Sequence, residues 1–176
     1  DSVTAARDTH PAPQMKRLST LFGRVLMGAA ALFGLGQPGT AGAQSRWTAN
    51  ADDALLFDVR LGQYRLGDGV RGYQVPGGTC VDFADVLLAL DIPVRLDKKL
   101  RRATGWAFDE RHTLVVDREA GTVQIMNKGS RLGPGDVYDT PEGWCVATGT
   151  LGHWLGISLQ ADHGNALLIV KSATKL

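Results

Sequence analysis

Residues 73–83 read YQVPGGTCVDF, and residues 138–148 read YDTPEGWCVAT. Each segment is expected to contain a tight turn, because proline presets one backbone angle and glycine accepts a positive one. A short extended segment that carries a cysteine follows each turn. The two cysteines of the chain, Cys80 and Cys145, occupy the same place in the two segments. The sequence therefore predicts a corner, leading from a strand into a helix, that occurs twice.

The similarity extends beyond the two corners. When residues 73–97 are aligned without a gap to residues 138–162, eight of the 25 positions are identical. Average composition predicts only about one or two identities over this length. Because a repeat at a fixed offset is the signature of a repeated unit, the sequence predicts an internal duplication.

Each copy is expected to contain one short helix, over residues 83–90 in the first and 149–155 in the second. Apolar residues recur in both at helical spacing. Asp82 and Thr148 are the expected N-caps of the two helices. Asp91 and Gly156 are the expected left-handed residues at their C-terminal ends.

Most of the remaining sequence alternates between apolar and polar residues, which is typical of strands. The alternation predicts an opening hairpin within residues 55–66, three short strands within 106–126, and a final strand at 165–170. The predicted fold class is α+β, with two related small units that each have short antiparallel strands and one short helix. The first unit is expected at residues 54–127 and the second at 128–176.

A signal peptide is expected at residues 15–43. Lys16 belongs to a positive segment, residues 25–35 form an apolar stretch, and small residues precede Gln44 at the positions that a signal peptidase reads. The apolar stretch is shorter than the roughly 20 residues that a membrane-spanning helix needs. We therefore expect cleavage before Gln44 and a periplasmic or exported protein.

Two shorter segments flank the predicted signal peptide. Residues 1–14 are read as an upstream extension with no assigned role, and residues 44–53 are read as a linker. Lys and Arg total 19 against 18 Asp and Glu. This balance gives no overall field that favours nucleic acid, so no nucleic-acid partner is expected.

The two cysteines leave three chemical alternatives. Export favours a disulfide. Residues in equivalent positions meet only if they lie near the axis that relates the two copies. The bond can form only if the Cα atoms of the two cysteines come within about 7 Å. Two buried thiols are the second alternative, and a nucleophile is the third. A nucleophile needs a base, and none of the three candidate histidines stands in a recognisable signature with Cys80 or Cys145: His112, His153 and His163. No metal site is expected either, because the spacing of metal-ligand motifs is missing from the sequence.

Two features are candidates for binding. The first is the one dense basic cluster, which either forms a solvated face or contacts anionic envelope material or an acidic partner surface: Lys98, Lys99, Arg101 and Arg102. The second is Trp144, which follows a turn and is the best candidate for an exposed binding aromatic. Phe108 and Trp154 are expected to pack in the core.

The predicted order of strand, turn, short helix, strand and hairpin resembles the stalk-like domain of the copper amine oxidase N-terminal type, which often occurs in tandem in bacterial envelope proteins. It also resembles the duplicated periplasmic segment of some usher-like outer-membrane proteins of pilus assembly. The resemblance covers roughly residues 54–171. Five segments carry it: VRLGQYRL (59–66), GTCVDFADVLLALDIP (78–93), AGTVQI (120–125), GWCVATGTLGHWLGISL (143–159) and NALLIV (165–170).

The resemblance implies an exported, non-enzymatic binding or assembly module in outer-membrane or pilus biogenesis. The implied partner is an envelope protein or a surface-structure subunit, held through sheet edges and loop surfaces. No cofactor is expected, because the stalk-like domain lies apart from the copper-bearing catalytic domain of the oxidase. Two other functions stay open: a small envelope hydrolase with a cysteine nucleophile, and a purely structural spacer.

Overall fold

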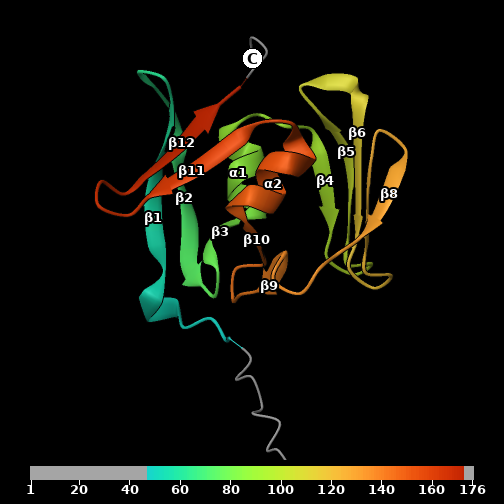
Figure 1. Ribbon diagram of the computed structural model, residues 1–176, viewed down its shortest axis with the longest axis horizontal. Coiled ribbons are helices and arrows are strands. Elements are labelled where there is room, and N and C mark those ends of the chain that lie inside the picture. The colour runs from blue at the N-terminus through green and yellow to red at the C-terminus, as the bar shows by residue number, and fades with distance from the viewer. Residues whose placement is uncertain (1–46, 173–176) are drawn as a thin grey trace, which may run out of the picture. The chain divides into compact units, whose positions relative to one another are not determined.

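The alternating residues near the start of the described chain form a hairpin of β1 (Leu55–Leu61) and β2 (Tyr64–Val75). Gly62 turns the chain with a φ of 59°, which residues with a side chain rarely adopt. The computed structural model describes residues 47–172 (Figure 1). The predicted upstream extension, the signal peptide and its cleavage site lie outside these residues.

A seven-stranded sheet is built around this hairpin, in the order β11, β12, β1, β2, β3, β10, β9. Its other strands are β3 (Gly78–Asp82), β9 (Val137–Asp139), β10 (Trp144–Ala147), β11 (Ser158–Asp162) and β12 (Leu167–Lys171). β12 runs parallel to β1, and the other neighbours are antiparallel. Strands from both predicted units therefore share one sheet.

The second sheet has five antiparallel strands in chain order. They are β4 (Val94–Asp97), β5 (Arg102–Ala107), β6 (Asp109–Asp117), β7 (Thr122–Ile125) and β8 (Lys128–Arg131). The expectation that Phe108 packs in the core is wrong, because this residue makes the turn between β5 and β6 with a φ of 61°. Its side chain is 38% exposed.

Two short helices lead out of the sheet. Asp82 caps α1 (Phe83–Ala89), accepting a hydrogen bond from the amide of Asp85 at 2.9 Å, as predicted. Thr148 is not a cap, because α2 (Thr148–Leu155) begins one residue earlier than expected and Ala147 takes the N-cap position without a side-chain hydrogen bond. The predicted left-handed ends are confirmed, since Asp91 and Gly156 have φ values of 51° and 70°.

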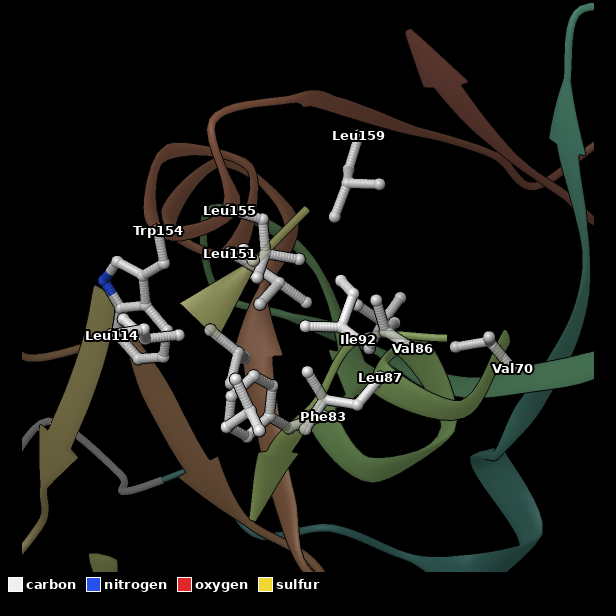
Figure 2. Packing of buried hydrophobic residues seen from close by; sticks show 14 of the residues in the cluster. Val70, Phe83, Val86, Leu87, Ile92, Leu114, Leu151, Trp154, Leu155 and Leu159 are labelled. Carbon is white, nitrogen blue, oxygen red and sulfur yellow. The ribbon is translucent and has the colours of Figure 1, made fainter. Parts of the chain in front are cut away.

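The helices pack between the two sheets (Figure 1). Figure 2 shows Leu151 and Leu155 of α2 pointing toward the side chains of α1. Trp154 is buried, as predicted, and meets Phe83 edge to face at 6.0 Å. Leu114 of β6 belongs to the same apolar cluster. One core therefore joins both sheets, and the described residues form a single compact unit with an α+β fold.

Residues that align in segments 73–105 and 138–170 pair in matching registers. In β2·β3 and β9·β10, each tyrosine lies opposite the cysteine that follows it. The hairpins β4·β5 and β11·β12 also match position by position. Four pairs illustrate this correspondence: Tyr73 with Cys80, Tyr138 with Cys145, Val94 with Gly105, and Leu159 with Val170.

Candidate functional site

A disulfide joins Cys80 and Cys145, which is the first of the three alternatives that the sequence left open. β3 and β10 are antiparallel neighbours, and the Cα atoms of the two cysteines lie 5.3 Å apart, within the range that a disulfide allows. Both residues are almost completely buried. The bond uses both cysteines of the chain, so neither is a free thiol.

Trp47 covers the disulfide region. Its ring meets Tyr73 at 5.9 Å and Tyr138 at 5.1 Å, both in edge-to-face geometry. The three aromatic residues and the two cysteines form a small apolar cluster of their own. Trp47 lies in the segment predicted as a linker, and its role was not anticipated. A single aromatic residue in an otherwise polar segment, just after the expected cleavage site, is the signal that could have indicated it.

A cavity of about 420 Å³ opens where the start of α1, the turn after β4 and the turn before β10 meet. We call it the Trp144 pocket. It brings together three of the predicted binding residues, Lys98, Arg101 and Trp144. Asp82, Ala84 and Glu142 also line it. Lys99 and Arg102 are exposed and do not line it.

Trp144 is a fixed wall of this pocket. Its ring stacks on Phe83 with a centroid distance of 6.2 Å and an interplanar angle of 3°. The guanidinium group of Arg118 lies 5.5 Å from the centre of the Trp144 ring, a geometry that permits a cation–π interaction. Trp144 is therefore half-buried, whereas the sequence suggested an exposed aromatic.

The basic side chains at the pocket are mostly neutralised by carboxylates. Arg101 lies 3.3 Å from Asp139 and 3.3 Å from Glu119. Arg71 forms two hydrogen bonds with Asp85, at 2.7 and 2.9 Å. These ion pairs are partly exposed, so each contributes little to stability. Their main effect is to remove positive charge that a ligand would otherwise meet.

Lys98 is the remaining cation of the lining, and it has no hydrogen bond or ion pair within residues 47–172. The predicted basic cluster is thus divided. Lys98 and Arg101 face the pocket, and only Lys98 keeps an uncompensated charge. The cluster does not act as one positive surface.

Three carboxylates around the pocket have perturbed pKa values. Burial raises the pKa of Asp82, which is only 3% exposed. A hydrogen bond of 2.9 Å from the hydroxyl of Tyr73 lowers the pKa of Glu142. For Asp85, burial opposes ionisation, but hydrogen bonds from the side chain and backbone of Arg71 outweigh it and lower the pKa.

Asp82 uses only one of its two carboxylate oxygens within the fold. Oδ1 accepts the capping hydrogen bond from Asp85. Oδ2 has no hydrogen-bond partner among residues 47–172 and lies 3.9 Å from the point where a Cβ on Gly143 would stand. The free oxygen therefore faces the turn that forms the opposite wall of the Trp144 pocket.

Of the three candidate histidines, two have hydrogen-bond partners other than the cysteines. His163 Nε2 lies 2.7 Å from the hydroxyl of Thr79, and His112 Nε2 lies 2.8 Å from the carbonyl oxygen of Trp154. His153 is exposed on α2. Within the described part of the chain, no group of three or more His, Cys, Asp or Glu side chains is placed to hold a metal ion.

Comparison with protein-family models, curated proteins and solved structures finds no significant match to this chain. Among residues 47–172, no helix is long and apolar enough to cross a membrane.

Proposed function

We propose that this protein is an exported, non-enzymatic module of the cell envelope that binds a partner protein in the Trp144 pocket. The observation that carries the proposal is the construction of this pocket from both halves of the domain. Asp82 and Ala84 come from the first half, and Glu142 and Trp144 come from the second. Its volume of about 420 Å³ lies within the range of roughly 300–1,000 Å³ that is typical of ligand sites.

We infer that the two halves are copies of one unit, related by an approximate two-fold axis. Val81 lies opposite Val146 in the β3·β10 pair, and these two residues occupy equivalent positions in the two copies. An axis between them exchanges the two strands and accounts for the matching registers. It also accounts for the disulfide, because Cys80 and Cys145 flank the axis as equivalent residues.

The disulfide supports both export and a role other than catalysis. Disulfides persist in oxidising compartments, and this one is consistent with such a location. The alternative hydrolase would require a free thiolate, whereas both cysteines of the chain are bonded. The setting in outer-membrane or pilus biogenesis rests on the resemblance to usher-like periplasmic segments.

We propose a protein partner, an envelope protein or surface-structure subunit, rather than anionic envelope material. An anionic surface would require a continuous positive patch. The ion pairs of Arg101 with Glu119 and Asp139 compensate the centre of the predicted basic cluster. What remains is a defined cavity, which suits a protruding group of a partner.

A capture experiment tests this function. The purified protein is immobilised and exposed to envelope extract, alongside an Ala84→Arg variant that fills the pocket from an exposed position on α1. Leu88→Arg is the matched control, since Leu88 is 83% exposed on the same helix and does not line the pocket. We expect the wild-type protein and Leu88→Arg to capture the same partner and Ala84→Arg to lose it. Equal capture by all three proteins, or capture of nothing, would contradict the proposal; the latter is what a structural spacer predicts.

A further inference from the structure

The Trp144 pocket has a counterpart at the equivalent corner of the other sequence copy. A second cavity, of about 210 Å³, is lined by residues that include 75–79, Ala147 and Gly149. We call it the Thr79 pocket. In the alignment of the two copies, residues 75–79 correspond to residues 140–144. Ala147 and Gly149 correspond to Asp82 and Ala84. The residues at 140–144, 82 and 84 all line the Trp144 pocket. The same corner thus forms a cavity on each side of the approximate axis.

The two cavities differ in chemistry at equivalent positions. Asp82 corresponds to Ala147, and Glu142 corresponds to Gly77. Trp144 corresponds to Thr79, whose hydroxyl is already engaged with His163 at 2.7 Å. One cavity therefore carries two carboxylates and an aromatic wall where the other carries small or satisfied residues. An aligned corner thus forms a cavity without these groups.

The charge around the Trp144 pocket is negative once ion pairs are counted. Asp85 compensates Arg71, and Glu119 and Asp139 together compensate Arg101 and Arg118, the latter lying against the Trp144 ring. Within residues 47–172, the lining side chains without an ion-pair partner are then one cation and three carboxylates: Lys98, Asp82, Asp97 and Glu142. The pocket attracts a positive group, even though three basic residues line it.

Asp82 is the group of the pocket best placed to meet a ligand. It is only 3% exposed as a residue, and its Oδ2 has no hydrogen-bond partner among the described residues and faces the cavity. Among these residues the side-chain atom that is both fully buried and unpartnered is Arg118 Nη1, so Asp82 Oδ2 remains accessible from the pocket. The capping role requires only Oδ1, and an uncharged asparagine caps about as well as aspartate. A donor that enters the pocket would satisfy the free oxygen.

The dipole of α1 does not reverse this preference. A helix N-terminus carries about half a positive charge, and α1 has only seven residues. The two carboxyl groups of Asp82 and Glu142 outweigh that partial charge. Glu142 stays ionised because the hydroxyl of Tyr73 donates to it at 2.9 Å and lowers its pKa.

We propose that the Trp144 pocket binds a lysine or arginine side chain of the partner protein, with its charged end at Asp82 and Glu142 and its apolar stem against Trp144. This inference rests on the proposed function, which makes the pocket a protein-binding site. It also implies that only one of the two equivalent cavities binds a ligand. The Thr79 pocket, which lacks the carboxylates, serves as an internal control.

The test uses small cationic probes on the intact protein. N-acetyl-arginine amide and N-acetyl-lysine amide are titrated against the isotope-labelled protein, with N-acetyl-glutamine amide as the neutral probe. We expect NMR shifts at residues 82–84 and 140–143 and at the indole of Trp144 with both cations. Residues 75–79 and the neutral probe should give no comparable shifts. Equal shifts with the neutral probe, or shifts centred on residues 75–79, would overturn the proposal.

Variants of the two carboxylates decide which groups hold the cation. Asp82→Asn keeps the cap and removes the charge, and we expect it to weaken probe affinity by at least about tenfold, the effect of one charged hydrogen bond. Glu142→Gln should also weaken binding and provides a second test if Asp82→Asn does not fold. Glu110→Gln is the control, because Glu110 is exposed on β6 outside the pocket. Unchanged affinity in both pocket variants would overturn the proposal.

Failure of this inference is distinguishable from failure of the proposed function. If Ala84→Arg abolishes partner capture while Asp82→Asn and Glu142→Gln leave it unchanged, the pocket binds a protein but not through a basic side chain. If the cationic probes bind in an Asp82-dependent manner but no partner is captured, the ligand chemistry stands and the proposed function is wrong.

Discussion

Breaking the Cys80–Cys145 bond should remove a large part of the stability of the domain. The bond links cysteines with a sequence separation of 65, and restricting a loop of this length in the unfolded chain is worth about 4 kcal/mol in the chain-entropy model. A small domain has a total stability of only about 5–15 kcal/mol. Both sulfurs are buried, so the double variant Cys80→Ala/Cys145→Ala also leaves a cavity and should lose somewhat more.

Urea denaturation followed by tryptophan fluorescence measures this loss, provided that the transition is two-state. Two perturbations separate its causes. Wild-type protein refolded with a reductant keeps both sulfur atoms and should lose about 4 kcal/mol, whereas the double variant adds the cost of the cavity. A loss below about 1 kcal/mol in the reduced protein, against the chain-entropy expectation, would refute the reasoning that the bond acts by restricting the unfolded chain.

The remaining predictions concern single side chains. Ala147→Ser should add the cap that α2 lacks and stabilise the fold by about 0.5–1 kcal/mol; an unchanged urea midpoint would contradict this. Burial raises the pKa of Asp82 above its usual value of 3.8, so stability should fall as pH rises through the raised value, and Asp82→Asn should lack this fall. Burial opposes ionisation of Asp85, but Arg71 lowers its pKa. The wild-type protein should therefore lose stability as pH drops below about 4, and Asp85→Asn should not show this loss. The same slope in both variants and the wild type would be inconsistent with these assignments. Trp47→Ala should cost about 1–3 kcal/mol through two lost edge-to-face contacts and speed reduction of the disulfide; an unchanged reduction rate would show that Trp47 does not protect it.

Local patterns predicted the elements whose structure depends on neighbouring residues. The alternation at 55–66 indicated the opening hairpin, and the left-handed ends at Asp91 and Gly156 followed from helix spacing. Long-range pairing was not accessible in this way. The parallel contact of β1 with β12 joins segments from opposite ends of the described chain, and nothing in the alternation of either strand specifies its neighbour.

The errors have local physical causes. Phe108 was expected in the core because it is apolar, but the tight turn between β5 and β6 occupies its position. Thr148 has a side chain suited to capping, yet β10 ends at Ala147 and the helix begins at once. In both cases the course of the backbone overrode the preference of the side chain.

The candidate site was only partly visible in the sequence. Trp144 and Lys98 were identified as binding candidates, and the structure places both at one pocket. Asp82 was interpreted only as a helix cap, because capping fully explains an aspartate before a helix. The alignment of residues 73–97 with residues 138–162 contains the missing signal, since Asp82 and Glu142 align with Ala147 and Gly77.

Photo-crosslinking in the cell envelope tests the central claim most directly. Pro141 and Pro76 align with each other and are not buried. Pro141 lines the Trp144 pocket, and Pro76 lines the Thr79 pocket. A benzophenone amino acid is introduced at one position or the other in the full chain, and the cells are irradiated. A discrete protein adduct from position 141 and none from position 76 is the predicted result. Adducts of equal yield from both positions, or none from position 141, would contradict the claim that the Trp144 pocket is the partner-binding site.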